Sequence, residues 1–272
     1  MRFKLFKLFL MSALVAFVTM LPSSCGRSGK YADSETERDS ASESSLPEGE
    51  DSLREPEEKN FEWAREWKAG TRVEEDEIEA FGVDSCFVAE DISDKLFNRI
   101  DGNSFNEEGL VKREDLQHLR LIHYDAGGEV RLGEMICNRK IAPDLLKVFR
   151  VLFESKYPIE SVRLIDDFNG DDVASMSANN TSCFNYRKTS GGSKLSKHAW
   201  GMAVDINPLY NPYVKKSAGQ VLPPEGKPYL DRDSVFLYKI DKNDMAYKEF
   251  TKRGFKWGGS WRTLKDYQHF QK

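Results

Sequence analysis

The stretch Ser196-Lys-His-Ala-Trp-Gly-Met-Ala-Val-Asp205 holds the residues from which this chain can first be interpreted. It places a histidine, His198, seven residues before an aspartate, Asp205, and the small residue Gly201 lies between them. Residues 203–207 have the composition of a short strand, on which successive side chains point to opposite faces. We therefore expect His198 in the loop before a strand and Asp205 on that strand, where main chains pack closely.

A second stretch near the C-terminus, Asp266-Tyr-Gln-His-Phe270, contributes another histidine, His269. Zinc accepts imidazole nitrogen and carboxylate oxygen, and catalytic zinc sites use three protein ligands with a fourth position left open. His198, Asp205 and His269 could form one such site, and Asp266 could accept a proton from the activated water. Spacing alone does not require this, because a hydrogen-bonded core histidine and surface charges would look the same.

The wider sequence around both stretches resembles a known family. Residues 180–213, together with Gly254-Phe-Lys-Trp-Gly-Gly-Ser-Trp261 and the Asp-x-x-His-Phe motif, are similar to the zinc D-alanyl-D-alanine carboxypeptidases. That group also includes bacteriophage L-alanyl-D-glutamate endopeptidases and the hedgehog signalling fold. The resemblance extends back to about Cys86. It implies an α+β fold of the hedgehog/DD-peptidase type and a single Zn²⁺ per chain.

The resemblance also implies roles for individual residues. His198, Asp205 and His269 match the family's zinc ligands, and Asp266 matches its catalytic base. Arg187 matches an arginine that stabilises the oxyanion of the tetrahedral intermediate, a role that suits a permanently charged guanidinium rich in donors. A surface salt bridge is the alternative for Arg187.

Four further residues are linked to the site by their position. Ser196 could hydrogen-bond within the site or simply form a turn, and Trp257 and Trp261 could frame a substrate cleft or pack in the core. Gln271 departs from the family, in which many members have glutamate directly after the His-Phe pair, so its effect on the site stays open.

The N-terminus predicts export. Arg2, Lys4 and Lys7 precede fourteen uncharged residues, 8–21, which are too few for a comfortable membrane span and typical of a signal peptide. Small residues and Cys25 follow, as in a bacterial lipoprotein signal, so we expect lipidation at Cys25 and anchoring to a bacterial membrane in the cell envelope. A plain secretory signal or an uncleaved anchor is the alternative.

Composition divides the chain into four segments: a signal peptide at 1–24, an acidic tether at 25–60, an N-terminal extension at 61–85 that packs on the domain, and a peptidase domain at 86–272. Residues 26–60 carry eleven acidic and five basic side chains with almost no large apolar ones. Such a segment buries too little apolar surface to offset its chain entropy, so we expect disorder rather than an ordered acidic subdomain.

Local patterns predict the elements of the domain. Residues 119–123 and 130–136 alternate as two strands around a turn at 125–128, and residues 159–165 alternate as a third. A helix begins near Pro143, and another, capped by Asn243 or Asp244, ends at Gly254. Helices and strands do not alternate regularly, which favours an α+β fold: a small, mainly antiparallel sheet with flanking helices.

The three cysteines of the domain, Cys86, Cys137 and Cys183, have no metal-binding spacing, and we expect buried thiols rather than one disulfide. His118 and His123 fit no motif and are interpreted as structural. The formal net charge of −5 provides no basic surface for nucleic acid.

These features together predict a monomeric, zinc-dependent peptidase that hydrolyses peptidoglycan stem peptides, either as a D-Ala-D-Ala carboxypeptidase or as an L-Ala-D-Glu or cross-link endopeptidase. The motifs do not distinguish the scissile bonds. The alternative is a non-catalytic wall-binding or signalling module on the same metal-bearing fold. A purely structural zinc site would need a fourth protein ligand, for which the sequence has no candidate.

Overall fold

The fold is described from a computed structural model of the chain, which covers residues 60–106, 109–189 and 192–272. The expected signal peptide, Cys25 and the acidic segment up to residue 59 lie outside the described residues. Among those described, no helix is both long and apolar enough to cross a membrane.

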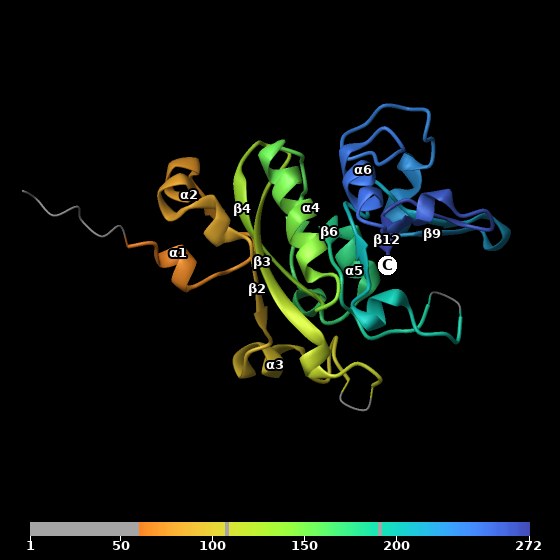
Figure 1. The fold of residues 1–272 in the computed structure, drawn as a ribbon. Coiled ribbons are helices and arrows are strands. Elements are labelled where there is room, and N and C mark those ends of the chain that lie inside the picture. The colour runs from red at the N-terminus through yellow and green to blue at the C-terminus, as the bar shows by residue number, and fades with distance from the viewer. Residues whose placement is uncertain (1–59, 107–108, 190–191) are drawn as a thin grey trace, which may run out of the picture. The chain divides into compact units, whose positions relative to one another are not determined.

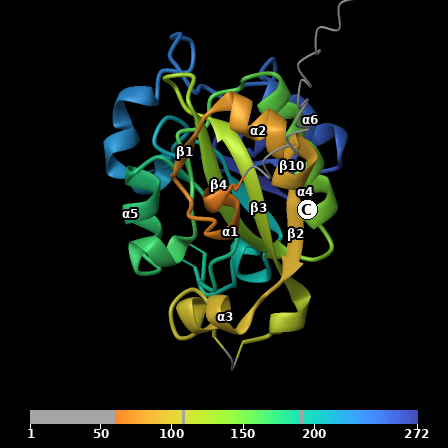
Figure 2. The same ribbon diagram turned by 90° about the vertical axis from the view of Figure 1, so that its left-hand side faces the viewer.

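The main sheet has four antiparallel strands in the order β1-β4-β3-β2 (Figures 1 and 2). Its centre is the predicted hairpin of β3 (Leu116–Tyr124) and β4 (Val130–Asn138), and the edges are β1 (Arg72–Val73) and β2 (Val88–Asp91). The side chain of Asp125 accepts hydrogen bonds from the Gly127 and Glu129 N–H groups, which closes the predicted turn.

Helix α4 (Ala142–Glu154) lies along β3 (Figure 1) and confirms the helix predicted near Pro143. Proline is tolerated in the first turn because its missing N–H would have no partner there. The helix buries an apolar stripe, Leu145, Val148, Phe149 and Leu152, in the largest hydrophobic cluster.

The strand predicted over residues 159–165 is mostly wrong. Only β5 (Ser161–Val162) forms, paired in parallel with β6 (Asn180–Thr181), and residues 165–168 turn into the 3-10 helix η3 (Ile165–Phe168). The buried Asn180 side chain explains the early end of the strand. Its amide accepts from the Arg163 N–H and donates to the Arg163 carbonyl, which takes the place of a neighbouring strand.

Two small antiparallel sheets follow in the C-terminal part. One has the order β10-β12-β7, from β10 (Lys256–Trp257), β12 (His269–Gln271) and β7 (Ala203–Asp205). The other has the order β11-β8-β9, from β11 (Lys265–Asp266), β8 (Tyr213–Lys215) and β9 (Gln220–Leu222). Helix α6 (Met245–Lys252) packs on α4 and β10 and is capped by Asp244, as predicted.

The remaining helices cover the main sheet and its ends. Helices α1 (Glu62–Arg65) and α2 (Glu75–Phe81) share a hydrophobic cluster with β3 and β4, in which Trp67 Nε1 donates to the Gly133 carbonyl. Helix α3 (Asp94–Ile100) belongs to a third cluster, and α5 (Asp172–Ser177) lies beside η3. The other short 3-10 helices are η1 (Val83–Cys86), η2 (Arg113–Asp115), η4 (Lys197–Trp200), η5 (Lys216–Ala218), η6 (Pro224–Tyr229) and η7 (Gly258–Ser260).

The fold is therefore α+β with mainly antiparallel sheets, as predicted. Cys86, Cys137 and Cys183 are all buried, as expected, and each is a free thiol in this structure.

The two histidines outside the motifs are held within the main sheet. His118 Nε2 lies 3.1 Å from Glu134, and the buried His123 donates from Nδ1 to the Ile159 carbonyl.

Candidate metal centre

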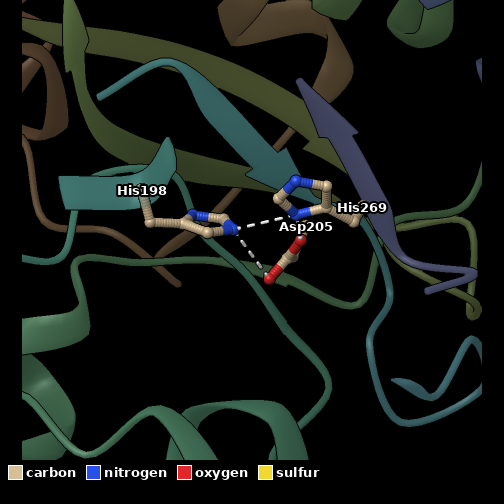
Figure 3. A group of neighbouring side chains, drawn as sticks. All are labelled: His198, Asp205 and His269. Atoms are coloured by element: carbon tan, nitrogen blue, oxygen red, sulfur yellow. Dashed lines mark hydrogen bonds and ion pairs between the residues drawn. The ribbon is translucent and has the colours of Figure 1, made fainter. Parts of the chain in front are cut away.

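Three buried side chains from two distant parts of the sequence meet at one point (Figure 3). Strands β7 and β12 pair so that Asp205 lies directly opposite His269. His198 reaches the same point from η4, one turn before β7. The distances are 3.1 Å between His198 Nε2 and His269 Nδ1, 3.2 Å between His198 Nε2 and Asp205 Oδ2, and 3.0 Å between His269 Nδ1 and Asp205 Oδ1.

The outer nitrogen of each imidazole has an acceptor of its own. His198 Nδ1 donates to the Cys183 carbonyl at 2.5 Å, and His269 Nε2 donates to Gln271 Oε1 at 3.0 Å. In neutral imidazoles these bonds leave the lone pairs of the inner nitrogens pointing at the Asp205 carboxylate. With the inner nitrogens free of protons, the two nitrogens and one carboxylate oxygen form a donor set that fits zinc.

The electrostatics of the cluster favour a positive charge at its centre. Burial raises the pKa of Asp205, but the neighbouring His198 and His269 outweigh burial and hold that pKa well below its ordinary value. Burial lowers the pKa of His269, but the hydrogen bond and charge of Asp205 outweigh it and raise that pKa to about 9. The negative charge of Asp205, which favours protons on these rings, would equally favour a metal cation in their place.

The local sequence holds His198 in place. Ser196 caps η4, and its hydroxyl accepts from the His198 N–H. The turn ends at Gly201, whose φ of +63° is one that L side chains rarely adopt. A Cβ at this position would lie 2.6 Å from the Asn138 nitrogen at the end of β4, which confirms the expected close packing of main chains.

Asp266 lies beside the cluster on β11. One of its carboxylate oxygens, Oδ2, is 4.0 Å from His269 Nδ1, and the other, Oδ1, is buried with no hydrogen-bond partner among the described residues. Burial, together with the charge of Asp205, raises the pKa of Asp266 to about 7, although His269 opposes the shift. A carboxyl with a pKa near neutrality can both take up and release a proton.

Arg187 extends toward the same space from the loop after β6. Its guanidinium forms an ion pair with Asp172 at 2.8 Å, and its Nε is buried with no partner in the part of the chain that the structure describes. Asp172 carries no recognisable signal in the sequence; it lies in the first turn of α5, fifteen residues before its partner. No spacing rule joins the two, so only the packing of α5 identifies Asp172 as part of the site.

A cavity of about 390 Å³ opens onto the three ligands, a size within the usual range of small-molecule sites. Four kinds of residue line it besides the ligands: the polar side chains Thr189, Ser196, Tyr213, Gln268 and Gln271; the charged Asp172, Arg187, Lys197, Lys215 and Asp266; the apolar Met176, Leu195, Leu222, Trp261 and Leu264; and Gly192.

The two tryptophans of the Gly254–Trp261 stretch separate. Trp261 lines the cavity, and its ring centroid is 5.3 Å from that of His269. Trp257 instead belongs to the largest hydrophobic cluster, and its Nε1 donates to the Tyr267 carbonyl. Core packing is thus the alternative that the structure favours for Trp257, which does not line this cavity.

A comparison with protein families gives one match. The family described as D-alanyl-D-alanine carboxypeptidase matches residues 190–272, which contain all three candidate ligands and Asp266. Over these residues, which make up less than a third of the chain, the sequence is similar to the D-alanyl-D-alanine carboxypeptidase family. The family recognised from the two motifs is therefore confirmed for this part of the chain. Searches of curated proteins and of solved structures found no match.

The match to the D-alanyl-D-alanine carboxypeptidase family supports a peptidase of the DD-carboxypeptidase type. Peptidases of this family depend on zinc, and the ligand set His198, Asp205 and His269 could bind that metal. Arg187 and Asp172 lie before the matched residues, so their place in the site rests on the geometry alone.

Proposed function

We propose that this protein is a zinc-dependent peptidase that hydrolyses the stem peptides of peptidoglycan. The observation that supports this function is the open side of the metal centre. Only three protein ligands converge among the described residues, and the side that they leave open faces a cavity containing Asp266. A structural zinc site is closed by a fourth protein ligand, whereas a catalytic one leaves room for water and substrate.

Hydrolysis needs a polarised scissile carbonyl, transfer of a proton from water to the leaving amine, and stabilisation of the oxyanion. Zinc, when bound, would polarise the scissile carbonyl and make water acidic enough to attack it near neutral pH. Asp266, with its raised pKa, would take the proton from the water and deliver it to the leaving amine. Arg187, oriented by its ion pair with Asp172, would donate to the oxyanion that forms at the carbonyl.

A location in the cell envelope fits this substrate. We propose export, lipidation at Cys25 and anchoring of the domain to a membrane, with the acidic segment 26–60 as the tether. A flexible chain of this length would span roughly 30 Å on average, so an anchored domain could reach wall material close to the membrane.

The function can be tested with purified protein and defined muropeptides. The protein is incubated with zinc, with a chelator, and with zinc restored after chelation, and products are identified by mass spectrometry. Release of D-alanine indicates a carboxypeptidase, whereas a split stem indicates an endopeptidase. Zinc content, measured by elemental analysis, should be one ion per chain and should be lost in His269→Ala.

The controls separate catalysis from binding. Asp266→Ala should keep zinc and lose turnover, because it removes the proton acceptor but no ligand. If no stem peptide gives a zinc-dependent product although peptides bind, the non-catalytic wall-binding module is the better description. Zinc content that is unchanged in His269→Ala would refute the ligand assignment.

A further inference from the structure

Gln268 is one of the cavity residues to which neither the motifs nor the proposed mechanism gives a role. It lies between Tyr267 and the ligand His269 and is only 1% exposed. Its main chain is fixed, because its carbonyl accepts from the Ile206 N–H at 3.0 Å. The residue is nevertheless one of those that line the cavity in which a substrate would lie.

The side-chain oxygen of Gln268 is buried and accepts no hydrogen bond from the described residues. Other buried amides in this protein show how unusual that is. The oxygens of Asn180, Asn207 and Asn211 each accept at least one hydrogen bond from a main-chain N–H. A buried acceptor without a partner destabilises the folded state, so Gln268 is an exception that requires an explanation.

Two other residues that line the same cavity, Arg187 and Asp266, also have a buried polar atom, Nε and Oδ1, with no partner among the described residues. Three such atoms on residues that line one cavity are consistent with a polar ligand that supplies their missing hydrogen bonds. Arg187 and Asp266 already have roles in the proposed reaction. The oxygen of Gln268 is an additional acceptor and needs a donor from the ligand.

We infer that Gln268 binds a main-chain N–H of the substrate peptide next to the scissile bond. This inference rests on the proposed function for the identity of the ligand, a peptide, and on the structure for the choice of Gln268. Gln268 lines the cavity onto which the three metal ligands open, so a peptide bound in that cavity is the ligand that could contact its amide. A peptide chain offers an N–H at every residue, and the neutral amide oxygen suits that donor.

A buried acceptor of this kind is also a specificity device. A site built to hydrogen-bond a substrate N–H rejects an analogue that lacks the N–H, because the acceptor is then left desolvated and unpaired. Gln268 would thereby align the peptide and favour substrates with a free amide at that position.

The test compares peptides with matched analogues in which each non-scissile N–H is replaced, one at a time, by an ester oxygen. Binding is measured by calorimetry on the zinc-free protein, where no turnover interferes, for the wild type, Gln268→Met and Gln117→Met. Methionine has nearly the shape of glutamine but no hydrogen-bonding oxygen. Gln117 is a glutamine on β3 outside the cavity and serves as the control.

On the wild type and on Gln117→Met, one analogue in the series should bind about tenfold more weakly than the parent peptide, the upper range for one neutral hydrogen bond. On Gln268→Met this analogue and the parent should bind alike, and the parent should bind about tenfold more weakly than to the wild type. The thermal midpoint of the free Gln268→Met protein should not fall, because the substitution removes an unpaired polar atom.

Two results would overturn the inference. One is an analogue penalty on Gln268→Met as large as on the wild type. The other is a fall in thermal midpoint that accompanies the loss of binding, which would make Gln268 a structural residue. Peptide binding without hydrolysis by the zinc-loaded protein would contradict the proposed catalysis and leave this inference standing, whereas absence of any stem-peptide binding would contradict both.

Discussion

Gly258 allows the metal centre and the proposed base to occupy their places, and Gly258→Ala tests this directly. A Cβ at position 258 would lie 2.6 Å from the Asp266 carbonyl oxygen, 2.7 Å from Asp266 Cβ and 3.3 Å from His269 Cβ. Ordinary contacts of a Cβ begin at 3.4 Å, so the neighbours would have to move by roughly 0.8 Å. Two residues of the site would therefore be displaced by a single methyl group that takes no part in the chemistry.

The expected effect is larger on function than on stability. Overpacking of this kind costs about 1–3 kcal/mol of unfolding free energy, whereas a misplacement of about 1 Å at a catalytic centre can cost about 100-fold in rate. We therefore expect Gly258→Ala to remain folded, to bind zinc more weakly and to cleave stem peptides about 100-fold more slowly.

Gly133→Ala is the matched control. A Cβ at position 133 would lie 2.8 Å from Leu121 Cδ1 and 2.9 Å from Val162 Cβ, so the steric insertion is similar, but it falls in the main sheet away from the cavity. Both variants should lose similar stability in urea titrations, and only Gly258→Ala should lose zinc affinity in chelator competition and turnover. Equal zinc affinity and turnover in the two variants would refute the reasoning.

Three further predictions concern groups whose surroundings are described above. Burial raises the pKa of Asp244 to about 6, so the folded protein keeps a proton that the unfolded chain loses, and stability should fall as pH rises from about 4 to 6 by on the order of 2–3 kcal/mol. Asp244→Asn, which keeps a capping side chain, should remove that slope in urea titrations, and an unchanged slope would contradict the assignment. Burial lowers the pKa of His123 to about 4, so the unfolded chain takes up a proton first, and stability should fall by about 3 kcal/mol as pH decreases from about 6.5 to 4. His123→Asn should abolish this acid-side loss, and its persistence would point to other groups. Gln271→Met removes the acceptor that orients His269 and should weaken zinc binding about 10–100-fold. The thermal stability of the zinc-free protein should not change. Zinc affinity equal to that of the wild type in chelator competition would show that the hydrogen bond does not orient the ligand.

Features carried by neighbouring residues were predictable from the sequence. The hairpin of β3 and β4, helix α4 and the cap at Asp244 each depend on a short pattern of apolar, turn or capping residues. The metal ligands were predictable for a different reason, because their motifs resemble a family in which those positions bind zinc. From spacing alone, the same residues did not require a site.

Features that depend on distant packing were not predictable in this way. Residues 159–165 alternate like a strand, but the Asn180 amide binds the Arg163 main chain and ends the strand early. Trp257 could equally have faced a cleft, and the packing of α6 and β12 around it placed it in the core. Asp172 and Gln268 carry no sequence signal, since an ion-pair partner and an unpaired amide are recognised only by their surroundings.

The sequence by itself determined the chemistry available to this protein: two imidazoles and a carboxylate able to bind zinc, and a second carboxylate nearby in the chain. Only the tertiary structure decided that these groups meet. His198 and His269 are 71 residues apart in the chain, and the pairing of β7 with β12 brings their ring nitrogens within 3.1 Å. The reason is physical. The kind of donor atom belongs to a single residue, but coordination, a raised carboxyl pKa and a buried unpaired amide arise from distances and burial, which the packing of distant segments creates.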